Sequence, residues 1–324
     1  MVFKDTWEKT QELLDLSPEL LQRILLHAFP GHQVTPRVLS GGCANLNLHV
    51  QLDHQLEYLL RIYHRDKGAA IREQKIAHLV KGRIPTPGYL RIGCWEGHTY
   101  AVCDFVSGIS LRELLLRHPE EDASTALHES AHLIARLREI SFDHSGFFND
   151  ELIPMSPLSS EGFVDFMQQC LAEEDVLKCL GDSVVQQLST LISEHRSHVP
   201  DFSQHTLVHG DFDPANLLVH PIDGIWRVAA LLDWEFAFSG PWICDVATML
   251  RYAKRISSAY EASFLQGLQE AGVHLPDHWR CTTDFANLAS LLDCLCRGVH
   301  QRPRQAKDIQ SLIGEILARL KKTS

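Results

Sequence analysis

The stretch of sequence that decides the fold runs from residue 207 to residue 218 and reads Leu-Val-His-Gly-Asp-Phe-Asp-Pro-Ala-Asn-Leu-Leu. Asp211 and Asn216 lie five positions apart in it, on either side of a turn that contains a proline. Asp233 follows 17 positions after Asn216, and the pair Asp223-Gly224 between them separates two apolar runs. An Asp-Gly pair in this setting predicts a β-hairpin. Such a hairpin would return Asp233 to the loop that holds Asp211 and Asn216.

These side chains suit one kind of chemistry. When a phosphoryl group is transferred to a hydroxyl, an acidic side chain orients or deprotonates the hydroxyl, and oxygen ligands hold the magnesium ion that bridges the phosphates. Carboxylate and amide oxygens are hard donors, which Mg²⁺ prefers. The pattern of Asp211, Asn216 and Asp233 therefore favours a magnesium-dependent phosphotransferase.

The chain before this loop divides into strands and one inserted helix. It opens with a helix whose start is Ser17-Pro18-Glu19, a capping side chain followed by a proline and an acid in the first turn. Apolar and polar residues alternate over 46–52, which predicts a half-buried strand. Together these patterns predict a small β-rich layer. Its strands are expected at 34–39, 46–52, 58–63, 88–92 and 98–106, and its inserted helix at 67–81.

The remainder of the chain has a mainly helical pattern. Ser110-Leu111-Arg112-Glu113 is a capping box that starts an amphipathic helix. A long helix is expected over 123–140 and further helices over 160–197, with the hairpin strands at 217–220 and 226–232 interrupting them. We therefore expect an α+β protein with a boundary near residue 107. The two parts are an N-terminal lobe of residues 1–106 and a C-terminal lobe of residues 107–324.

The motif residues resemble one known family. The segment at 207–218 is similar to the catalytic loop of the aminoglycoside phosphotransferase and choline kinase family, with His-Gly-Asp where protein kinases carry His-Arg-Asp. Leu232-Asp233-Trp234-Glu235 resembles the strand end that binds metal in this family, and residues 240–247 resemble the segment that follows it. The resemblance implies a bilobal, protein-kinase-like fold with a small β-rich N-lobe and a larger, mainly helical C-lobe.

The resemblance also assigns roles to single residues. It implies that Asp211 is the catalytic base and that Asn216 and Asp233 bind Mg²⁺. It implies that Asp245, near the start of a helix, anchors the catalytic loop or caps the helix.

A nucleotide site in the first lobe is implied in the same way. The family's nucleotide-covering turn corresponds to residues 40–45, where glycines let backbone N–H groups approach phosphate oxygens. Its hinge, whose backbone binds adenine, corresponds to residues 104–106. The residues expected in these two places are Ser40, Gly41, Gly42, Asn45, Asp104 and Val106.

One position of the nucleotide site departs from the family pattern. The family carries a lysine in the third strand, which reaches the phosphates and pairs with a glutamate on the helix. This chain has Arg61 in that strand and Glu73 as the expected helix partner. Arginine keeps the charge and can bind phosphate with two nitrogens, but its shape differs from that of lysine. The expected cofactors are ATP, with GTP not excluded, and Mg²⁺.

A second motif supports a different hypothesis. His128-Glu129-Ser130-Ala131-His132 has the H-E-x-x-H form of zinc proteases, in which both histidines share one helix face and the glutamate is the general base. The longer signature with a further glycine and histidine is absent. Alanines and leucines around the motif form a helix packing face, so an ordinary helix accounts for the same residues. A zinc hydrolase remains an alternative, with Glu139 or a remote residue as third ligand.

Composition limits the possible partners. The net charge of −11 argues against a nucleic-acid binder, which would normally show a basic face. The first residues are charged and no apolar run approaches the roughly 18 residues of a spanning helix, so no signal peptide and no membrane segment are expected. The nine cysteines stand mostly in apolar stretches, which favours reduced thiols in a cytosolic protein. We expect a cytoplasmic monomer or homodimer.

The acceptor is expected to be a small molecule with a hydroxyl group, and the acidic composition is compatible with a cationic one. An aminoglycoside-like antibiotic and an endogenous amino alcohol, sugar or amino-acid derivative are equally compatible with the sequence. A catalytically weak nucleotide-binding relative is a further alternative. The presence of Asp211, Asn216 and Asp233 together argues against it.

Overall fold

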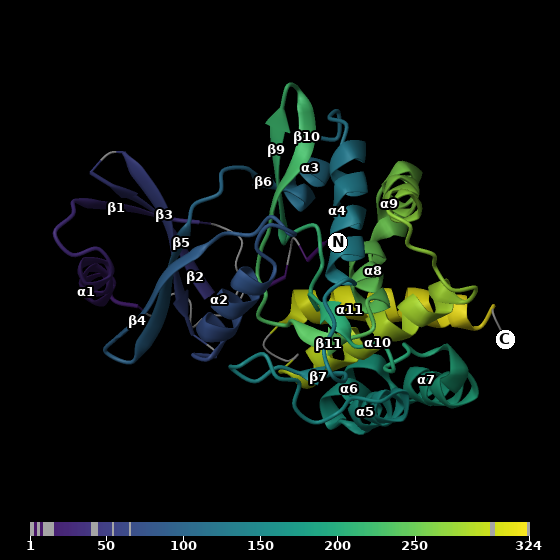
Figure 1. The fold of residues 1–324 in the computed structure, drawn as a ribbon. Helices are drawn as coiled ribbons and strands as arrows, with labels where there is room; N and C mark the ends of the chain where they lie inside the picture. The colour runs from purple at the N-terminus through teal and green to yellow at the C-terminus, as the bar shows by residue number, and fades with distance from the viewer. Residues whose placement is uncertain are drawn as a thin grey trace.

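An antiparallel sheet of five strands, in the order β1-β2-β3-β5-β4, forms the N-terminal part of the molecule (Figure 1). The computed structural model describes residues 3–4, 7–8, 16–39, 45–53, 55–64, 66–298 and 302–322. The elements of this part are α1 (Pro18–Ala28), β1 (Val34–Val38), β2 (Asn45–Leu52), β3 (Leu56–Tyr63), α2 (Ala69–Leu79), β4 (Tyr89–Trp95) and β5 (His98–Asp104).

The two faces of this sheet are covered by different helices. Ile24 of α1 packs with Leu48 and Ile62 in one apolar cluster. Ala70 of α2 packs with Tyr63 in another. Ile62 and Tyr63 are consecutive residues of β3, and successive side chains of a strand point to opposite faces. The sheet is therefore buried on both sides, and α2 lies on the side that faces the rest of the molecule (Figure 1).

Helices make up most of the C-terminal part (Figure 1). Their buried side chains form one continuous apolar cluster, which also includes Phe3 from the start of the chain. The helices are α3 (Leu111–Arg117), α4 (Ser124–Leu137), α5 (Ser160–Ala172), α6 (Glu174–Leu180), α7 (Asp182–Glu194), α8 (Ile243–Leu250), α9 (Ser258–Glu270), α10 (Trp279–Cys296) and α11 (Pro303–Leu320), with short 3-10 helices η2 (Arg196–His198) and η3 (Ala253–Arg255).

Short strands carry the loops between these helices. β9 (Leu217–Ile222) and β10 (Ile225–Leu231) form the predicted hairpin, and β6 (Ile109–Ser110) pairs with β9. Asp223 and Gly224 take φ angles of 50° and 78°, which match the tight turn that an Asp-Gly pair favours. β11 (Phe238–Gly240) lies between β7 (Gly146–Phe147) and β8 (Thr206–Val208).

The element predictions are confirmed, with differences at element ends. Ser17 and Ser110 accept hydrogen bonds from the N–H groups of Leu20 and Glu113, as predicted for helix caps. The helical stretch expected over 160–197 is divided into α5, α6, α7 and η2. Gly181, at a φ of 81°, stands between α6 and α7.

The cysteines and the helices of the described part of the chain can each be characterised. Its cysteines are all free thiols. None of its helices is long and apolar enough to cross a membrane.

Candidate active site

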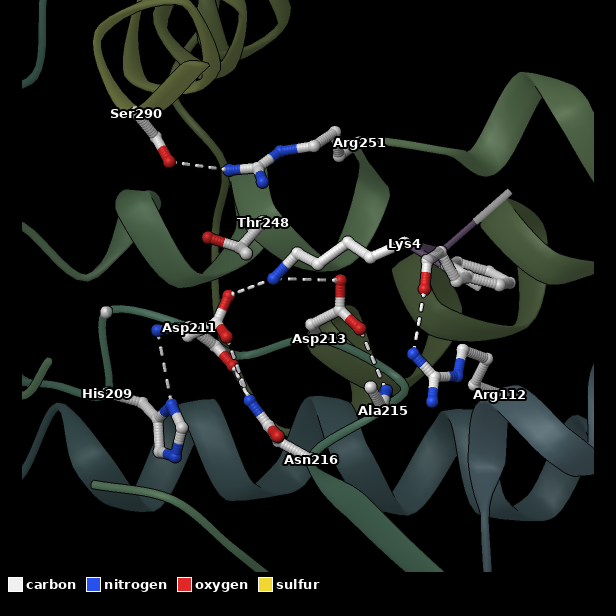
Figure 2. Close-up of polar contacts among 12 residues, drawn as sticks. Lys4, Arg112, His209, Asp211, Asp213, Ala215, Asn216, Thr248, Arg251 and Ser290 are labelled. Atoms are coloured by element: carbon white, nitrogen blue, oxygen red, sulfur yellow. Dashed lines mark hydrogen bonds and ion pairs between the residues drawn. The ribbon is translucent and has the colours of Figure 1, made fainter. Parts of the chain in front are cut away.

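The predicted catalytic loop, residues 209–216, connects β8 to β9. Figure 2 shows the polar contacts of its side chains. The side-chain amide of Asn216 donates to the backbone oxygen of Asp211 at 2.9 Å and to its carboxylate Oδ2 at 3.1 Å. Gly210 has a φ of 81°, and a Cβ there would lie 2.3 Å from the carbonyl oxygen of Phe236. Only glycine fits this position, so the shape of the loop requires the glycine of the His-Gly-Asp sequence.

Asp245 on α8 anchors the loop, as expected. Its two carboxylate oxygens accept the backbone N–H groups of His209 at 2.8 Å and Gly210 at 2.9 Å. Burial raises the pKa of Asp245 to about 7, while these two hydrogen bonds act in the opposite direction. The helix thereby holds the residue directly before Asp211 in place.

The hairpin brings Asp233 back to this loop, as the sequence predicted. The backbone N–H of Leu232 donates to the carbonyl oxygen of Asn216 at 2.8 Å, and the Leu232 carbonyl lies 2.9 Å from Nε2 of His209. Asp233 follows directly and has a φ of 67°, a left-handed conformation that costs roughly 1–2 kcal/mol in a residue other than glycine. The backbone N–H and C=O groups of Leu232 therefore both join the end of this strand to the catalytic loop.

Arg61 occupies the place expected for the phosphate-binding lysine. Its Nη2 lies 3.2 Å from Oε1 of Glu73 and 2.7 Å from Oδ1 of Asp233. Glu73 is fully buried and also accepts the hydroxyl groups of Tyr63 and Tyr89. Burial opposes the charge on Arg61, but Asp233 and Glu73 outweigh it and raise its pKa well above the ordinary value. The predicted Arg61–Glu73 pair is present, and it extends to Asp233.

A second acidic side chain lies beside Asp233. Glu235 accepts the side-chain amide of Asn45 at 3.3 Å. Burial raises the pKa of Glu235 to about 7, and the charge of Asp233 acts in the same direction. Carboxylates at Asp233 and Glu235 and the amide of Asn216 make a donor set of the hard oxygen type that suits Mg²⁺. The residues present therefore fit the ion that the resemblance implies.

The remaining residues expected at the nucleotide site belong to the turn at 40–45 and to the connection after β5. Ser40, Gly41 and Gly42 lie outside the described residues. Asp104 ends β5, and its carboxylate accepts the backbone N–H of Gly88 at 3.1 Å. Val106 follows in the connection to the helical part. That the backbone of this connection binds adenine stays a prediction.

Lys4 is a site residue that the sequence did not indicate. Its ammonium nitrogen lies 2.6 Å from Oδ1 of Asp211 and 3.7 Å from Oδ2 of Asp213 (Figure 2). The side chain of Asp213 is fully buried, and its Oδ1 accepts the backbone N–H of Ala215. Burial would lower the pKa of Lys4, but the two carboxylates outweigh it and raise that pKa. A charged N-terminal segment normally indicates only a solvated surface, so no local signal marked this lysine.

The segment around Lys4 is fixed to the C-terminal part by its neighbours. Phe3 is fully buried between Tyr252 and Tyr260, with ring centroids 5.5 and 5.8 Å away. The carbonyl oxygen of Phe3 accepts a hydrogen bond from Arg112 at 3.0 Å. Trp7 donates its indole N–H to Asp308 of α11 at 3.0 Å. Lys4 is therefore held at the catalytic loop by contacts on both sides of it.

The zinc hydrolase alternative does not agree with the geometry of its glutamate. Both carboxylate oxygens of Glu129 are used, one by the guanidinium of Arg227 at 2.6 Å and one by the backbone N–H of Val228 at 2.9 Å. These bonds tie α4 to β10. The carboxylate is not placed to act as a general base beside a metal held by His128 and His132.

Comparison with solved structures reveals relatives with the same fold. Aminoglycoside phosphotransferase APH(4)-Ia is 19% identical, with 93% of this chain and 99% of that chain covered and a TM-score of 0.70. Aminoglycoside 2'-phosphotransferase-IIIa is 17% identical over 94% and 99% of the two chains, with a TM-score of 0.68. The microcompartment-associated aminopropanol kinase is 14% identical over 94% and 97%, with a TM-score of 0.63.

Comparison with known sequences and family models identifies the family of this chain. No curated protein sequence matches the chain. A family model does: that of the phosphotransferase enzyme family, APH, matches residues 35–284, which is more than half of the 324 residues. The matched span contains the sheet, the catalytic loop and the hairpin. The chain therefore belongs to the phosphotransferase enzyme family and has its kinase-like fold.

Proposed function

We propose that this protein is a small-molecule kinase that moves the γ-phosphoryl group of ATP to a hydroxyl group in a magnesium-dependent reaction. The observation that carries the proposal is the hydrogen-bonded set at the catalytic loop. Asn216 donates to the carboxylate of Asp211, and the strand end that carries Asp233 is bonded to the backbone of Asn216. The acid that we propose for the acceptor and the two oxygen ligands that we propose for the metal therefore belong to one hydrogen-bonded region.

In this proposal Asp211 binds the acceptor hydroxyl and takes its proton. The acceptor oxygen then forms a bond to the γ-phosphorus while the bond from that phosphorus to the bridging oxygen breaks, and ADP leaves. Asn216 and Asp233 would hold Mg²⁺, which neutralises phosphate charge when it is bound. Arg61, and the backbone at residues 40–45, would contact the phosphates.

Lys4 has a role in the same proposal. Its ammonium group, 2.6 Å from Asp211, orients the carboxylate and keeps it ionised. It also places a positive charge beside the position of the phosphoryl group in transfer. Because Lys4 and the nearby Arg251 together place two positive charges beside the carboxylates of Asp211 and Asp213, we expect the acceptor to present a neutral hydroxyl at this point rather than an ammonium.

We propose a chemical class, rather than a single compound, for both the acceptor and the nucleotide donor. Structural neighbours were solved with AMP-PNP and hygromycin B and with GDP, and one is an aminopropanol kinase. Hydroxyl-bearing aminoglycosides and short amino alcohols are therefore the first acceptors to test, with ATP and GTP as donors. The same screen should include neutral sugars, because the local charge at Asp211 does not require a cation.

The proposal is tested with Asp211→Asn, which keeps the size of the side chain and removes its charge. We expect turnover in a coupled ADP-release assay to fall by about 10²–10⁴-fold, since Asp211 acts as the base. The circular dichroism spectrum should be unchanged, and chelation of Mg²⁺ should abolish wild-type turnover. Wild-type rates in the variant, or turnover that does not depend on a metal ion, would contradict the mechanism.

A further inference from the structure

The two histidines of the motif at residues 128–132 take no part in the phosphotransfer site. They lie one helical turn apart on α4, with ring centroids 5.0 Å from each other. Glu270, the last residue of α9, meets them there, because its Oε2 lies 2.8 Å from Nε2 of His128. One ligand atom from each of the three side chains lies within 4.8 Å of the other two.

This convergence is built into the packing of α4 on α9. Gly267 precedes Glu270 by three residues and faces the backbone of α4. A Cβ at Gly267 would lie 2.6 Å from the carbonyl oxygen of His128 and 2.9 Å from the Cβ of Ala131. Glycine is therefore required for the helices to approach this closely. The helix that carries the carboxylate is held directly against the helix that carries both histidines.

One ring nitrogen of His132 lacks a hydrogen-bond partner among the described residues. Its Nε2 is buried and has no hydrogen-bond partner among the residues that the structure describes. Buried polar atoms in folded proteins nearly always have a partner, so each exception calls for a physical reason. An ion bound between His128, His132 and Glu270 would supply one.

We propose that His128, His132 and Glu270 bind a divalent transition-metal ion of the zinc type, which ties α4 to the end of α9. Two imidazoles and a carboxylate are ligands that Zn²⁺ holds at about 2.0–2.2 Å. Tetrahedral ligand atoms are then roughly 3.3 Å apart. Ligand atoms that are now up to 4.8 Å apart therefore need to approach each other by about 1.5 Å at most, and the His128–Glu270 pair at 2.8 Å needs to separate slightly. A water molecule would complete the coordination.

The site is structural rather than hydrolytic. Zinc hydrolases place a glutamate beside the metal-bound water as general base. Here the motif glutamate, Glu129, is bonded to Arg227 and Val228 on β10. The metal therefore contributes stability to the contact of α4 with α9, and its removal leaves the catalytic loop in place.

The test is a zinc titration of the full chain, made without a histidine tag and stripped with a chelator. We expect isothermal calorimetry to give one Zn²⁺ per chain with a micromolar or lower dissociation constant. The melting temperature should rise with excess zinc, because the ion binds only the folded state. Co²⁺ in place of zinc should give the visible absorption of a tetrahedral site.

Matched variants make the result specific. His132→Gln and Glu270→Gln should each weaken zinc binding by about tenfold or more and abolish the rise in melting temperature. His278→Gln is the control, since His278 belongs to a different group of histidine rings, 4.7 Å from His198, and should bind zinc as the wild type does. Far-ultraviolet circular dichroism in chelator checks that each variant is folded.

Three outcomes would overturn the proposal. One is a wild-type chain that binds no zinc at micromolar concentration. Another is a His132→Gln variant that binds zinc as the wild type does. The third is loss of binding in His278→Gln, which would place the ion elsewhere. None of these measurements depends on phosphotransfer, so they are separate from the test of the proposed function.

Discussion

At the scale of single residues, Lys4 governs the charge state of Asp211. Burial raises the pKa of Asp211, but the charge and hydrogen bond of Lys4 outweigh burial and hold that pKa below its ordinary value. In return Asp211 and Asp213 outweigh the burial of Lys4 and raise its pKa. Arg251 adds a second positive charge near the loop, held by Asn287 and Ser290. Asp211 is therefore ionised throughout the neutral range.

We expect Lys4→Met to lower kcat by about 10- to 100-fold. A hydrogen bond between charged groups contributes roughly 1.5–3 kcal/mol, and methionine keeps the apolar stem without the charge. With the ammonium gone, the pKa of Asp211 rises. The acidic limb of the rate profile should then move to higher pH. Steady-state ADP release, measured from acid to neutral pH, checks both effects.

Two further variants control this measurement. Lys4→Arg keeps the positive charge and should restore the acidic limb toward its wild-type position. Lys178→Met removes an exposed lysine that pairs with Glu174 on the surface of α6, and it should not change the rate. A Lys4→Met enzyme faster than the wild type would mean that the N-terminal segment blocks the acceptor rather than assisting Asp211.

At the scale of elements, the N-terminal segment completes a helix at the other end of the chain. α11 begins at Pro303 with no capping hydrogen bond from its own N-cap side chain. Instead the carboxylate of Glu8 accepts the backbone N–H groups of Arg304 at 2.7 Å and Gln305 at 3.1 Å. The first N–H groups of a helix have no partner within it, and a negative charge there is favoured by the helix dipole.

Glu8→Gln should therefore lower the free energy of unfolding by about 0.5–1 kcal/mol at neutral pH. Burial acts to raise the pKa of Glu8, but the N–H groups of Arg304 and Gln305 outweigh it and lower the pKa in the folded state. The stabilising contribution is thus present above the ordinary pKa of glutamate and is lost as the pH falls through the folded value. Urea denaturation at several pH values checks this.

The difference between wild type and Glu8→Gln should shrink as the pH falls below the ordinary pKa of glutamate, and it should vanish once the pH has passed the lowered pKa of the folded state, where Glu8 is protonated in both states. Glu139→Gln, at an exposed glutamate outside the helices, serves as control and should show no such trend. A constant difference between wild type and Glu8→Gln at every pH would mean that the charge of Glu8 does not contribute to the cap.

At the scale of the whole molecule, one arginine joins the sheet to the catalytic region. Arg61 on β3 bonds Glu73 on α2 and Asp233 beyond β10, and these elements come from the two parts seen in Figure 1. Trp234, next to Asp233, donates its indole N–H to the hydroxyl oxygen of Thr86 at 3.0 Å. Thr86 lies between α2 and β4, in the N-terminal part. The site that we propose for the nucleotide is thus built from both parts, and its charges also hold them together.

Arg61→Met should lower the free energy of unfolding by about 3–5 kcal/mol, because the fully buried Glu73 loses its cation. It should also weaken binding of AMP-PNP by about tenfold or more, through loss of a charged contact to phosphate. Urea denaturation and a fluorescence titration with AMP-PNP check the two effects.

Arg61→Lys keeps the charge and should fall between the wild type and Arg61→Met in both measurements. Arg37→Met, at an exposed arginine of β1, is the control and should match the wild type. If Arg61→Met bound AMP-PNP with wild-type affinity, Arg61 would be a structural residue and not a phosphate ligand.

The sequence predicted the catalytic region well because its functional residues lie close together along the chain. The interval between Asp211 and Asn216 and the Asp-Gly turn before Asp233 are local features, and the structure brings these residues together as expected. Lys4 could not be found in this way, since it lies 207 positions from the carboxylate that it contacts. Glu270 was likewise missed as a partner of the histidines on α4.

By itself, the sequence determined the division into a β-rich and a helical part, the catalytic loop and the hairpin, because periodicity and turn residues act through the local backbone. Only the tertiary structure decided which charged groups meet. Burial of Phe3 brings Lys4 to Asp211, and the close helix contact at Gly267 brings Glu270 to the histidines of α4. Such contacts depend on side-chain packing between distant segments, which no short stretch of sequence contains.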